Sequence, residues 1–208
     1  MHNSQPGRRG RSTASRVADH VHLLRAYVRD PRRTGAVAPS SRWLAARMTE
    51  GMRLGAATCV VEVGAGTGSF TPSILRAMRP RARLLVVELN RELAGRLRAR
   101  FRRADVIRGS VEHLPRFLSA RGCPAADAVV SSLPWTTLTR PLQEKLLRAI
   151  AGSMRPGARF STYVYVHSAW MPGAARFRRL LRRTFRKVRR TPVVLRNIPP
   201  AFVYRCEK

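Results

Sequence analysis

The chain has 208 residues, which is long enough for one substantial hydrophobic core and too short for two ordinary domains. Hydrophobic residues make up 44% of the sequence and aromatic residues 7%, a composition that excludes a wholly disordered protein. The charge is far from balanced, because 41 Lys and Arg stand against 11 Asp and Glu and give a formal net charge of +30. This excess indicates a polyanionic partner, either a nucleic acid or an anionic membrane surface.

The three cysteines, Cys59, Cys123 and Cys206, are far apart and form no CxxC pair or Cys/His cluster. Their pattern argues against a disulfide framework and against a zinc site, and it favours a reducing cytosol. The longest segment without a charged residue, 160–175, is too short to span a bilayer. No apolar stretch follows the polar first sixteen residues, so no secretory signal is expected. We therefore expect a metal-free cytoplasmic protein, either soluble or peripheral on a membrane.

Three segments are expected along the chain. Residues 1–15 are predicted to form a flexible basic tail. Residues 16–32 are predicted to form an amphipathic helix, because apolar residues recur there at helical spacing. Residues 33–208 are predicted to form the globular domain, in which Ser40 and Ser41 begin a first helix as candidate N-caps.

Beyond residue 57 the pattern alternates between apolar runs and amphipathic segments. Strands are predicted at 58–63, 84–89, 105–108, 126–131 and 160–166. Helices are predicted at 69–79, 91–102, 141–154 and 176–190, followed by a closing hairpin with strands at 193–196 and 202–205. Continuous apolar strands separated by helices indicate a parallel sheet covered on both faces. The predicted fold is a single α/β domain with a mostly parallel seven-stranded sheet and a C-terminal antiparallel hairpin.

A glycine-rich loop follows the first predicted strand and opens a helix. Glu62 precedes the loop 64–68, whose sequence Gly-Ala-Gly-Thr-Gly permits a tight turn and a close approach of the backbone to a ligand. Ser69 stands where a dinucleotide-binding fingerprint needs its third glycine, and the loop lacks the Gly-Lys-Ser/Thr of a P-loop. Glu88, twenty residues further on at the end of the second strand, can accept hydrogen bonds from two ribose hydroxyls. The alternative is a plain strand–helix turn beside a surface glutamate.

These residues resemble the first motif of the class I S-adenosylmethionine-dependent methyltransferases, which have a Rossmann-like fold. By that resemblance, Glu62 helps to hold the methionine amino end of S-adenosylmethionine, and Glu88 binds its ribose. The remaining residues implied to line this cofactor are Gly64, Ala65, Gly66, Gly68 and Leu89. The family often has an Asp beside the adenine after the third strand. Here Ser110 follows that strand instead, and the adenine contact is expected from Ser110, Val111 or Glu112.

The fourth predicted strand ends in the segment 131–135, Ser-Ser-Leu-Pro-Trp. In open α/β sheets the chemistry lies outside the carboxyl ends of the strands, so this loop is expected to face the transferable methyl group. Amino-group methylases carry Asn-Pro-Pro-Tyr or Asn-Leu-Pro-Tyr there; here Ser132 replaces the Asn and Trp135 keeps the aromatic position. Ser132, Pro134 and Trp135 are candidate catalytic residues, and Ser132 is also a candidate cofactor contact. The alternative is a turn with a partly buried Trp135.

A more specific resemblance covers nearly the whole chain beyond the tail. Residues 23–28 and 33–41 are similar to the N-terminal signature of the bacterial phospholipid N-methyltransferases. That family also shows the Ser-Leu-Pro loop of residues 132–134 and the Arg-Asn-hydrophobic-Pro-Pro-Ala turn of residues 196–201. The resemblance implies methylation of the amine of phosphatidylethanolamine, and of its mono- and dimethyl derivatives, on the inner face of the cell membrane.

Such a reaction needs a neutral amine, so a group must accept a proton from the lipid ammonium. Tyr163, Tyr165 and His167 alternate along the fifth strand and share one face, which makes His167 or Tyr165 the candidate acceptor or orienting group. Trp135, Tyr165 and Trp170 are candidate aromatic faces for a methylated ammonium. Core packing is the alternative explanation for each of them.

The predicted helix 176–190 holds nine Lys or Arg in fifteen residues, and an anionic partner would relieve the repulsion among them. Phosphate contacts dominate RNA affinity, so an rRNA adenine N6-methyltransferase fits this charge as well as a membrane enzyme does. Ser132 in the Asn position argues against the RNA reaction. A third alternative is a non-enzymatic RNA- or membrane-binding protein with a vestigial cofactor site. The sequence assigns no oligomeric state.

Overall fold

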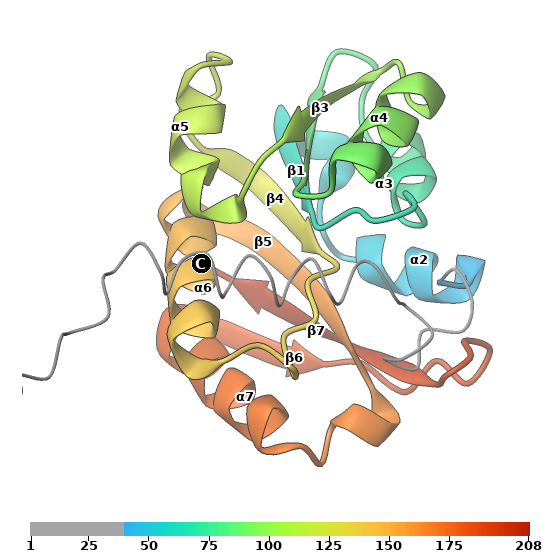
Figure 1. Ribbon diagram of the computed structural model, residues 1–208, viewed down its shortest axis with the longest axis vertical. Coiled ribbons are helices and arrows are strands. Elements are labelled where there is room, and N and C mark those ends of the chain that lie inside the picture. Colours follow the sequence, from blue (N-terminus) through green and yellow to red (C-terminus); the bar gives the residue numbers. More distant parts are fainter. Residues whose placement is uncertain (1–39) are drawn as a thin grey trace, which may run out of the picture.

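The computed structural model describes residues 40–208 and arranges them around one seven-stranded sheet (Figure 1). The strands lie in the order β3-β2-β1-β4-β5-β7-β6. Their bounds are β1 (Cys59–Val63), β2 (Arg83–Glu88), β3 (Ala104–Arg108), β4 (Ala126–Ser131), β5 (Met154–Tyr165), β6 (Lys187–Arg190) and β7 (Ala201–Glu207). The first five strands pair in parallel, and β7 runs antiparallel to both β5 and β6. The predicted seven-stranded, mostly parallel sheet with an antiparallel C-terminal pair is confirmed.

Helices cover both faces of this sheet (Figure 1). The α-helices are α2 (Arg42–Thr49), α3 (Thr71–Ala77), α4 (Arg91–Arg100), α5 (Leu114–Ser119), α6 (Arg140–Gly152) and α7 (Pro172–Thr184). Three short 3₁₀ helices join them, η1 (Leu54–Ala56), η2 (Val111–His113) and η3 (Val166–Ser168). One hydrophobic cluster joins α2, α3 and α4 to one face of the sheet, and a second joins α5, α6 and α7 to the other. None of the described helices is long and apolar enough to cross a bilayer.

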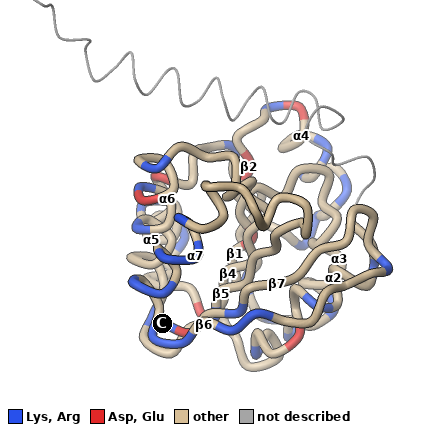
Figure 2. Tube along the Cα trace, turned by 90° about the horizontal axis from the view of Figure 1, so that it is seen from below, with Lys and Arg blue, Asp and Glu red and all other residues tan. Residues whose placement is uncertain are grey.

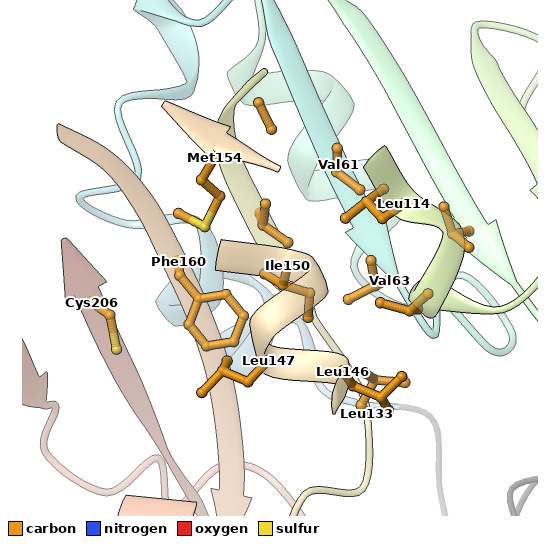
Figure 3. Close-up of a cluster of buried hydrophobic side chains, with 14 of the residues drawn as sticks. Val61, Val63, Leu114, Leu133, Leu146, Leu147, Ile150, Met154, Phe160 and Cys206 are labelled. Atoms are coloured by element: carbon orange, nitrogen blue, oxygen red, sulfur yellow. The ribbon is translucent and has the colours of Figure 1, made fainter. Parts of the chain in front are cut away.

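The central strands are buried on both sides, which explains why they are apolar without alternation. Val61 and Val63 of β1 belong to the cluster under α6, and Figure 3 shows Val61 beside Leu114. Val60, one position along the strand, belongs to the opposite cluster. Residue 62 therefore faces the side of the sheet covered by α2, α3 and α4.

The C-terminal elements differ from the prediction. The helix expected over 176–190 ends at Thr184, and Lys187–Arg190 forms the edge strand β6. The predicted hairpin strand at 193–196 is wrong, since only Val194 makes an isolated bridge, to Ala201. Its place is taken by β6, whose Lys and Arg side chains lie at the solvent-exposed sheet edge.

Ser41 begins α2 as predicted, because its side-chain oxygen accepts a hydrogen bond from the backbone N–H of Leu44 at 3.2 Å. The helix predicted over 141–154 ends at Gly152, and Met154 already belongs to β5. The predicted tail 1–15 and the predicted amphipathic helix 16–32 lie outside the described residues.

Candidate functional site

The glycine-rich loop joins β1 to α3 at the carboxyl edge of the sheet. Gly64 has a φ of 68°, and a β-carbon there would lie 2.8 Å from Cδ2 of Leu133. Gly66 has a φ of 58°, and a β-carbon there would meet no atom within 4 Å. The left-handed backbone and the close approach of Leu133 explain the glycine at 64. The open space beside Gly66 is where a ligand can approach the loop backbone.

Glu88 lies directly under this loop at the end of β2. Glu88 is only 2% exposed, and its Oε2 accepts a hydrogen bond from the N–H of Gly66 at 2.9 Å. Oε1 accepts another from the N–H of Asn90 at 2.9 Å. Each carboxylate oxygen keeps further lone-pair capacity for hydroxyl donors. The predicted pairing of the loop with the acid of the second strand is therefore present in the fold.

Glu62 is fully buried on β1, and one of its oxygens has no partner. Oε2 accepts a hydrogen bond from the hydroxyl of Thr71 at 2.7 Å, whereas Oε1 is buried without any hydrogen bond. Burial raises the pKa of the Glu62 carboxyl to about 7; the charge of Glu88 adds to this rise, and the Thr71 hydrogen bond opposes it. An unpaired buried acceptor with a raised pKa suits a cationic ligand group. Sequence reasoning missed Thr71, which opens α3 as the first helical residue after the loop.

The candidate adenine contacts follow β3, next to Glu88. The N–H of Gly109 donates to the backbone oxygen of Glu88 at 3.0 Å, which holds the end of β3 beside the loop. Val111 is buried in the core, and Glu112 pairs with Lys145 at 2.6 Å. Ser110 begins η2 as its N-cap, accepts a hydrogen bond from the N–H of Glu112 and is half-buried, so of the three candidates it is the one neither in the core nor in an ion pair. Of the other expected cofactor contacts, Leu89 is half-buried after β2, Ala65 is buried and Gly68 closes the loop.

The loop after β4 is fixed to β1 and to the core. The N–H of Ser132 donates to the backbone oxygen of Val63 at 2.9 Å, while the Ser132 hydroxyl is buried without a partner. The indole N–H of Trp135 donates to the hydroxyl of Ser131 at 3.0 Å. Trp135 is 1% exposed, and its ring stacks on Phe177 of α7 at 4.6 Å between centroids. Trp135 is thus a core residue, and one face of its ring is already occupied.

Gln143 of α6, which the sequence did not single out, holds this loop against α7. Its side-chain amide donates to the backbone oxygens of Trp135 at 2.5 Å and Gly173 at 3.1 Å. Gln143 is 1% exposed, so both bonds are buried. A β-carbon on Gly173 would lie 1.9 Å from the backbone oxygen of Thr136, so the start of α7 packs directly on the loop.

A small pocket, partly open to solvent, lies between this loop and the end of β5. Its walls come from residues 133–137, including Pro134, and from Tyr163, Tyr165 and Ser168. The rings of Tyr163 and Tyr165 meet edge to face, with 5.3 Å between their centroids. The ring of Tyr165 stacks on that of His167, with 5.5 Å between centroids. His167 lies in η3 just beyond the strand and is exposed. The predicted grouping of these three side chains is therefore present, with His167 at the outer end.

The carboxylates of the described chain fall into two groups. Those that form ion pairs with Lys or Arg are Glu50, Glu92, Asp105, Glu112, Asp127, Glu144 and Glu207. Glu62 and Glu88 are the only two between residues 40 and 208 that lack a basic partner, although Lys and Arg far outnumber Asp and Glu along the tube in Figure 2. Within the same residues, no group of three or more His, Cys, Asp or Glu is placed to hold a metal ion.

A methyltransferase-domain family model matches residues 60–157. The chain is 37% identical over 175 residues to an ornithine lipid N-methyltransferase from Singulisphaera acidiphila, covering 82% of this chain and 86% of that protein. It is 36% identical over 99 residues to ribosomal RNA small subunit methyltransferase A from Thermosynechococcus vestitus, covering 47% of this chain and 34% of that protein. The fold matches an O-methyltransferase of tomaymycin synthesis from Streptomyces achromogenes, solved with S-adenosylmethionine, at a TM-score of 0.65 and 18% identity over 92% of this chain and 96% of that chain.

Proposed function

The chain belongs to the class I S-adenosylmethionine-dependent methyltransferases, and from this premise we propose that it methylates the primary amine of a membrane lipid head group. The observation that carries the proposal is the 37% identity to a lipid N-methyltransferase, which spans most of both chains. That relative acts, by its name, on ornithine lipid, and the sequence motifs resemble enzymes of phosphatidylethanolamine. The two lipids share a primary amine, so the amine defines the proposed substrate class.

The cofactor is S-adenosylmethionine, which supplies a methyl group on a sulfonium. The residues present fit it. The unpartnered Oε1 of Glu62 is suited to the methionine ammonium, and Glu88 is suited to the ribose hydroxyls. The open space beside Gly66 leaves room for the ligand along the loop. In a protein with a net charge of +30, keeping these two carboxylates free of Lys and Arg is consistent with their use by a cationic ligand.

On the substrate side, the protein has to align an amine with the methyl group and exclude water. The pocket beside the β4 loop provides a partly enclosed space at the carboxyl edge. Ser132 precedes the residues that line it, and we assign its buried, unpartnered hydroxyl the role of orienting the amine. We assign to Tyr165, which lines the pocket, the role of holding the head group. His167, stacked on Tyr165 and exposed, then takes the proton of the ammonium and passes it to solvent. Pro134 shapes the pocket wall, and Trp135 supports it from the core.

The high net positive charge of the protein indicates an anionic partner, which we propose to be the membrane. A net charge of +30 favours the negatively charged inner face of the cell membrane, where a lipid substrate is presented at high local concentration. We therefore propose a peripheral enzyme on that face. The rRNA reaction is the second candidate, and the similarity to the rRNA enzyme, limited to 34% of that protein, makes it worth a direct comparison.

The test is transfer of labelled methyl from S-adenosylmethionine to one of three acceptors. These are vesicles of phosphatidylethanolamine in phosphatidylglycerol, vesicles of ornithine lipid in phosphatidylglycerol, and stripped small-subunit rRNA. The proposal expects label in at least one of the two lipids, and the pair of lipid arms tells which head group is preferred. Label in the rRNA alone would overturn it. A His167→Phe variant keeps an aromatic ring next to Tyr165, so a rate lowered about a hundredfold would assign proton transfer rather than stacking to His167.

A further inference from the structure

The large exposed hydrophobic side chains of the described residues gather in three short segments. They are Trp43, Trp170, Met171, Val193, Leu195 and Ile198. Trp170 is 89% exposed, Ile198 76% and Leu195 75%, so most of the surface of these three residues is in contact with solvent. Single exposed apolar residues are ordinary, but a set confined to one region marks an interaction surface.

The three segments lie at the same edge of the sheet. Strands β5 and β6 are both antiparallel to β7, so both end at the edge where β7 begins. The backbone N–H of Val166, just after β5, donates to the oxygen of Pro200 in the turn before β7 at 2.9 Å. The guanidinium of Arg196 in that turn lies 4.7 Å from the ring centroid of Trp43 in α2. These contacts join Trp43, Trp170, Leu195 and Ile198 into one surface, here called the rim.

The rim adjoins the mouth of the pocket. Tyr165 and Ser168 line the pocket, and Trp170 follows Ser168 after one residue. The turn of the rim is bonded to Val166, next to Tyr165. A surface that covers the rim therefore also faces the opening into which the proposed substrate amine must enter.

The charge around the rim has one sign. The cations that flank it include Arg42 and Arg196, both exposed and both next to the ring of Trp43. No Asp or Glu occurs between residues 145 and 206, and Glu50, at the other end of α2, is paired with Arg47 and Arg205. Exposed apolar side chains flanked by arginines complement a bilayer with anionic head groups, because the apolar groups can insert while the arginines contact the head groups.

We propose that the rim docks this protein on an anionic lipid bilayer, with Trp170, Leu195 and Ile198 inserted among the head groups. The inference rests on the proposed function, since it names the surface through which a lipid reaches the pocket. Aliphatic Leu195 and Ile198 favour a bilayer over RNA, because bases stack on aromatic rings and gain little from a branched aliphatic side chain. Docking at the rim brings the pocket mouth to the level of the lipid amines.

The first test uses the full chain and the double variant Leu195→Ser/Ile198→Ser, with Leu195→Met/Ile198→Met as the matched control. Both sites are exposed, so neither variant is expected to change thermal unfolding. Sedimentation with phosphatidylglycerol/phosphatidylethanolamine vesicles should be about tenfold weaker for the Ser variant and unchanged for the Met variant. Equal sedimentation of all three proteins would overturn the inference. Loss of RNA binding with vesicle binding kept would overturn it in favour of an RNA surface.

The second test reads the orientation of the protein on the vesicle. In a Trp43→Phe background, brominated lipids should quench the fluorescence of the exposed Trp170 and leave that of the buried Trp135 unchanged. The variant Trp43→Phe/Trp170→Phe, which retains only Trp135, separates the two signals. Absence of Trp170 quenching on bound protein would contradict docking at the rim. Methylation of a dispersed short-chain amino lipid separates the two proposals. If the Ser variant keeps that activity and loses vesicle binding, both proposals hold. If no amino lipid is methylated but vesicle binding still depends on Leu195 and Ile198, the proposed function fails and the rim remains a membrane-binding surface.

Discussion

The side-chain oxygen of Asn197 accepts a hydrogen bond from the backbone N–H of Ser41 at 2.8 Å, joining two segments that are 156 positions apart. Asn197 is 1% exposed, and its amide nitrogen donates in turn to the backbone oxygen of Pro199 at 2.7 Å. One buried side chain thus ties the start of α2 to the turn before β7. The two sequence stretches that resemble the lipid methyltransferase signatures, around residues 41 and 197, are in contact through it.

Replacing Asn197 by Ala should destabilise the protein by about 1–3 kcal/mol, because the N–H of Ser41 and the oxygen of Pro199 both lose a partner. Denaturant unfolding of the two proteins measures the difference. Asn197→Asp should destabilise the protein at least as much, because it buries a carboxylate and places one of its oxygens against the backbone oxygen of Pro199. Equal stability of wild type and Asn197→Ala would show that the contact contributes nothing to the fold.

Glu62→Gln should change how stability depends on pH. The pKa of Glu62 is raised to about 7 in the fold from an ordinary 4.5, so the stability linked to its protonated form is complete below about pH 4.5 and is lost as the pH rises through 7. Glutamine cannot ionise, so without cofactor the variant should gain stability relative to wild type between pH 5 and 8. Thermal unfolding of both proteins across this range tests it. Identical pH profiles would mean that Glu62 does not titrate there.

The same substitution should weaken the binding of the cofactor. Binding of the methionine ammonium favours ionised Glu62, so wild-type affinity should rise between pH 5.5 and 7.5 as the carboxyl loses its proton. A glutamine side chain carries no charge, so Glu62→Gln should bind more weakly and show a flat pH profile. Calorimetric titration with S-adenosylmethionine at several pH values gives both affinities.

Glu88→Gln should lower the affinity for S-adenosylmethionine by about tenfold to a hundredfold, the range expected when charge-assisted hydrogen bonds are lost. Glu92→Gln is the matched control. Glu92 is a glutamate of the neighbouring α4 that forms only an exposed pair with Arg96, so its removal should leave affinity unchanged. Equal losses for the two variants would remove the ribose assignment from Glu88.

The cofactor side was predictable from sequence because its parts are local. A strand, a glycine-rich turn and an acid at the end of the next strand suffice to place Glu62 and Glu88, since parallel strands bring their carboxyl ends to one edge. The burial of Trp135 in the core could not be predicted in this way. Its orientation depends on Phe177, which lies on a helix that packs against the loop only in the folded chain. The Asn197 contact to Ser41 has the same long-range origin.

The error at the C-terminal end has a local cause. Phe185 and Val188 continue the spacing of the apolar residues in α7, so a helix through residue 190 fits the pattern as well as a strand does. Four residues of β6 are too few to show the alternation of a strand. Pairing with β7 decides the outcome in the fold. The helix α5 was missed for the same reason, since its six residues give little periodicity.

Arginines near the rim should matter more for membrane binding than arginines far from it. Arg42→Gln/Arg196→Gln and Arg182→Gln/Arg183→Gln each remove two charges, but the second pair lies in the last turn of α7, about 15 Å along its axis from the end that starts beside the rim. Attraction to a charged surface falls off within about 8–10 Å. Vesicle sedimentation at physiological salt should therefore weaken more for the first pair. A larger loss for the second pair would place the membrane contact on the face of α7.

The proposed acceptor of the methyl group is a lipid amine. Mass spectrometry of the lipids after incubation with the protein and S-adenosylmethionine tests it directly, with N-acetylated amino lipid in a parallel vesicle as the acceptor that lacks a free amine. We expect the amino lipid to gain the mass of one or more methyl groups on its head group and the acetylated lipid to remain unchanged. An amino lipid whose mass stays unchanged, like that of the acetylated lipid, would contradict the proposed function.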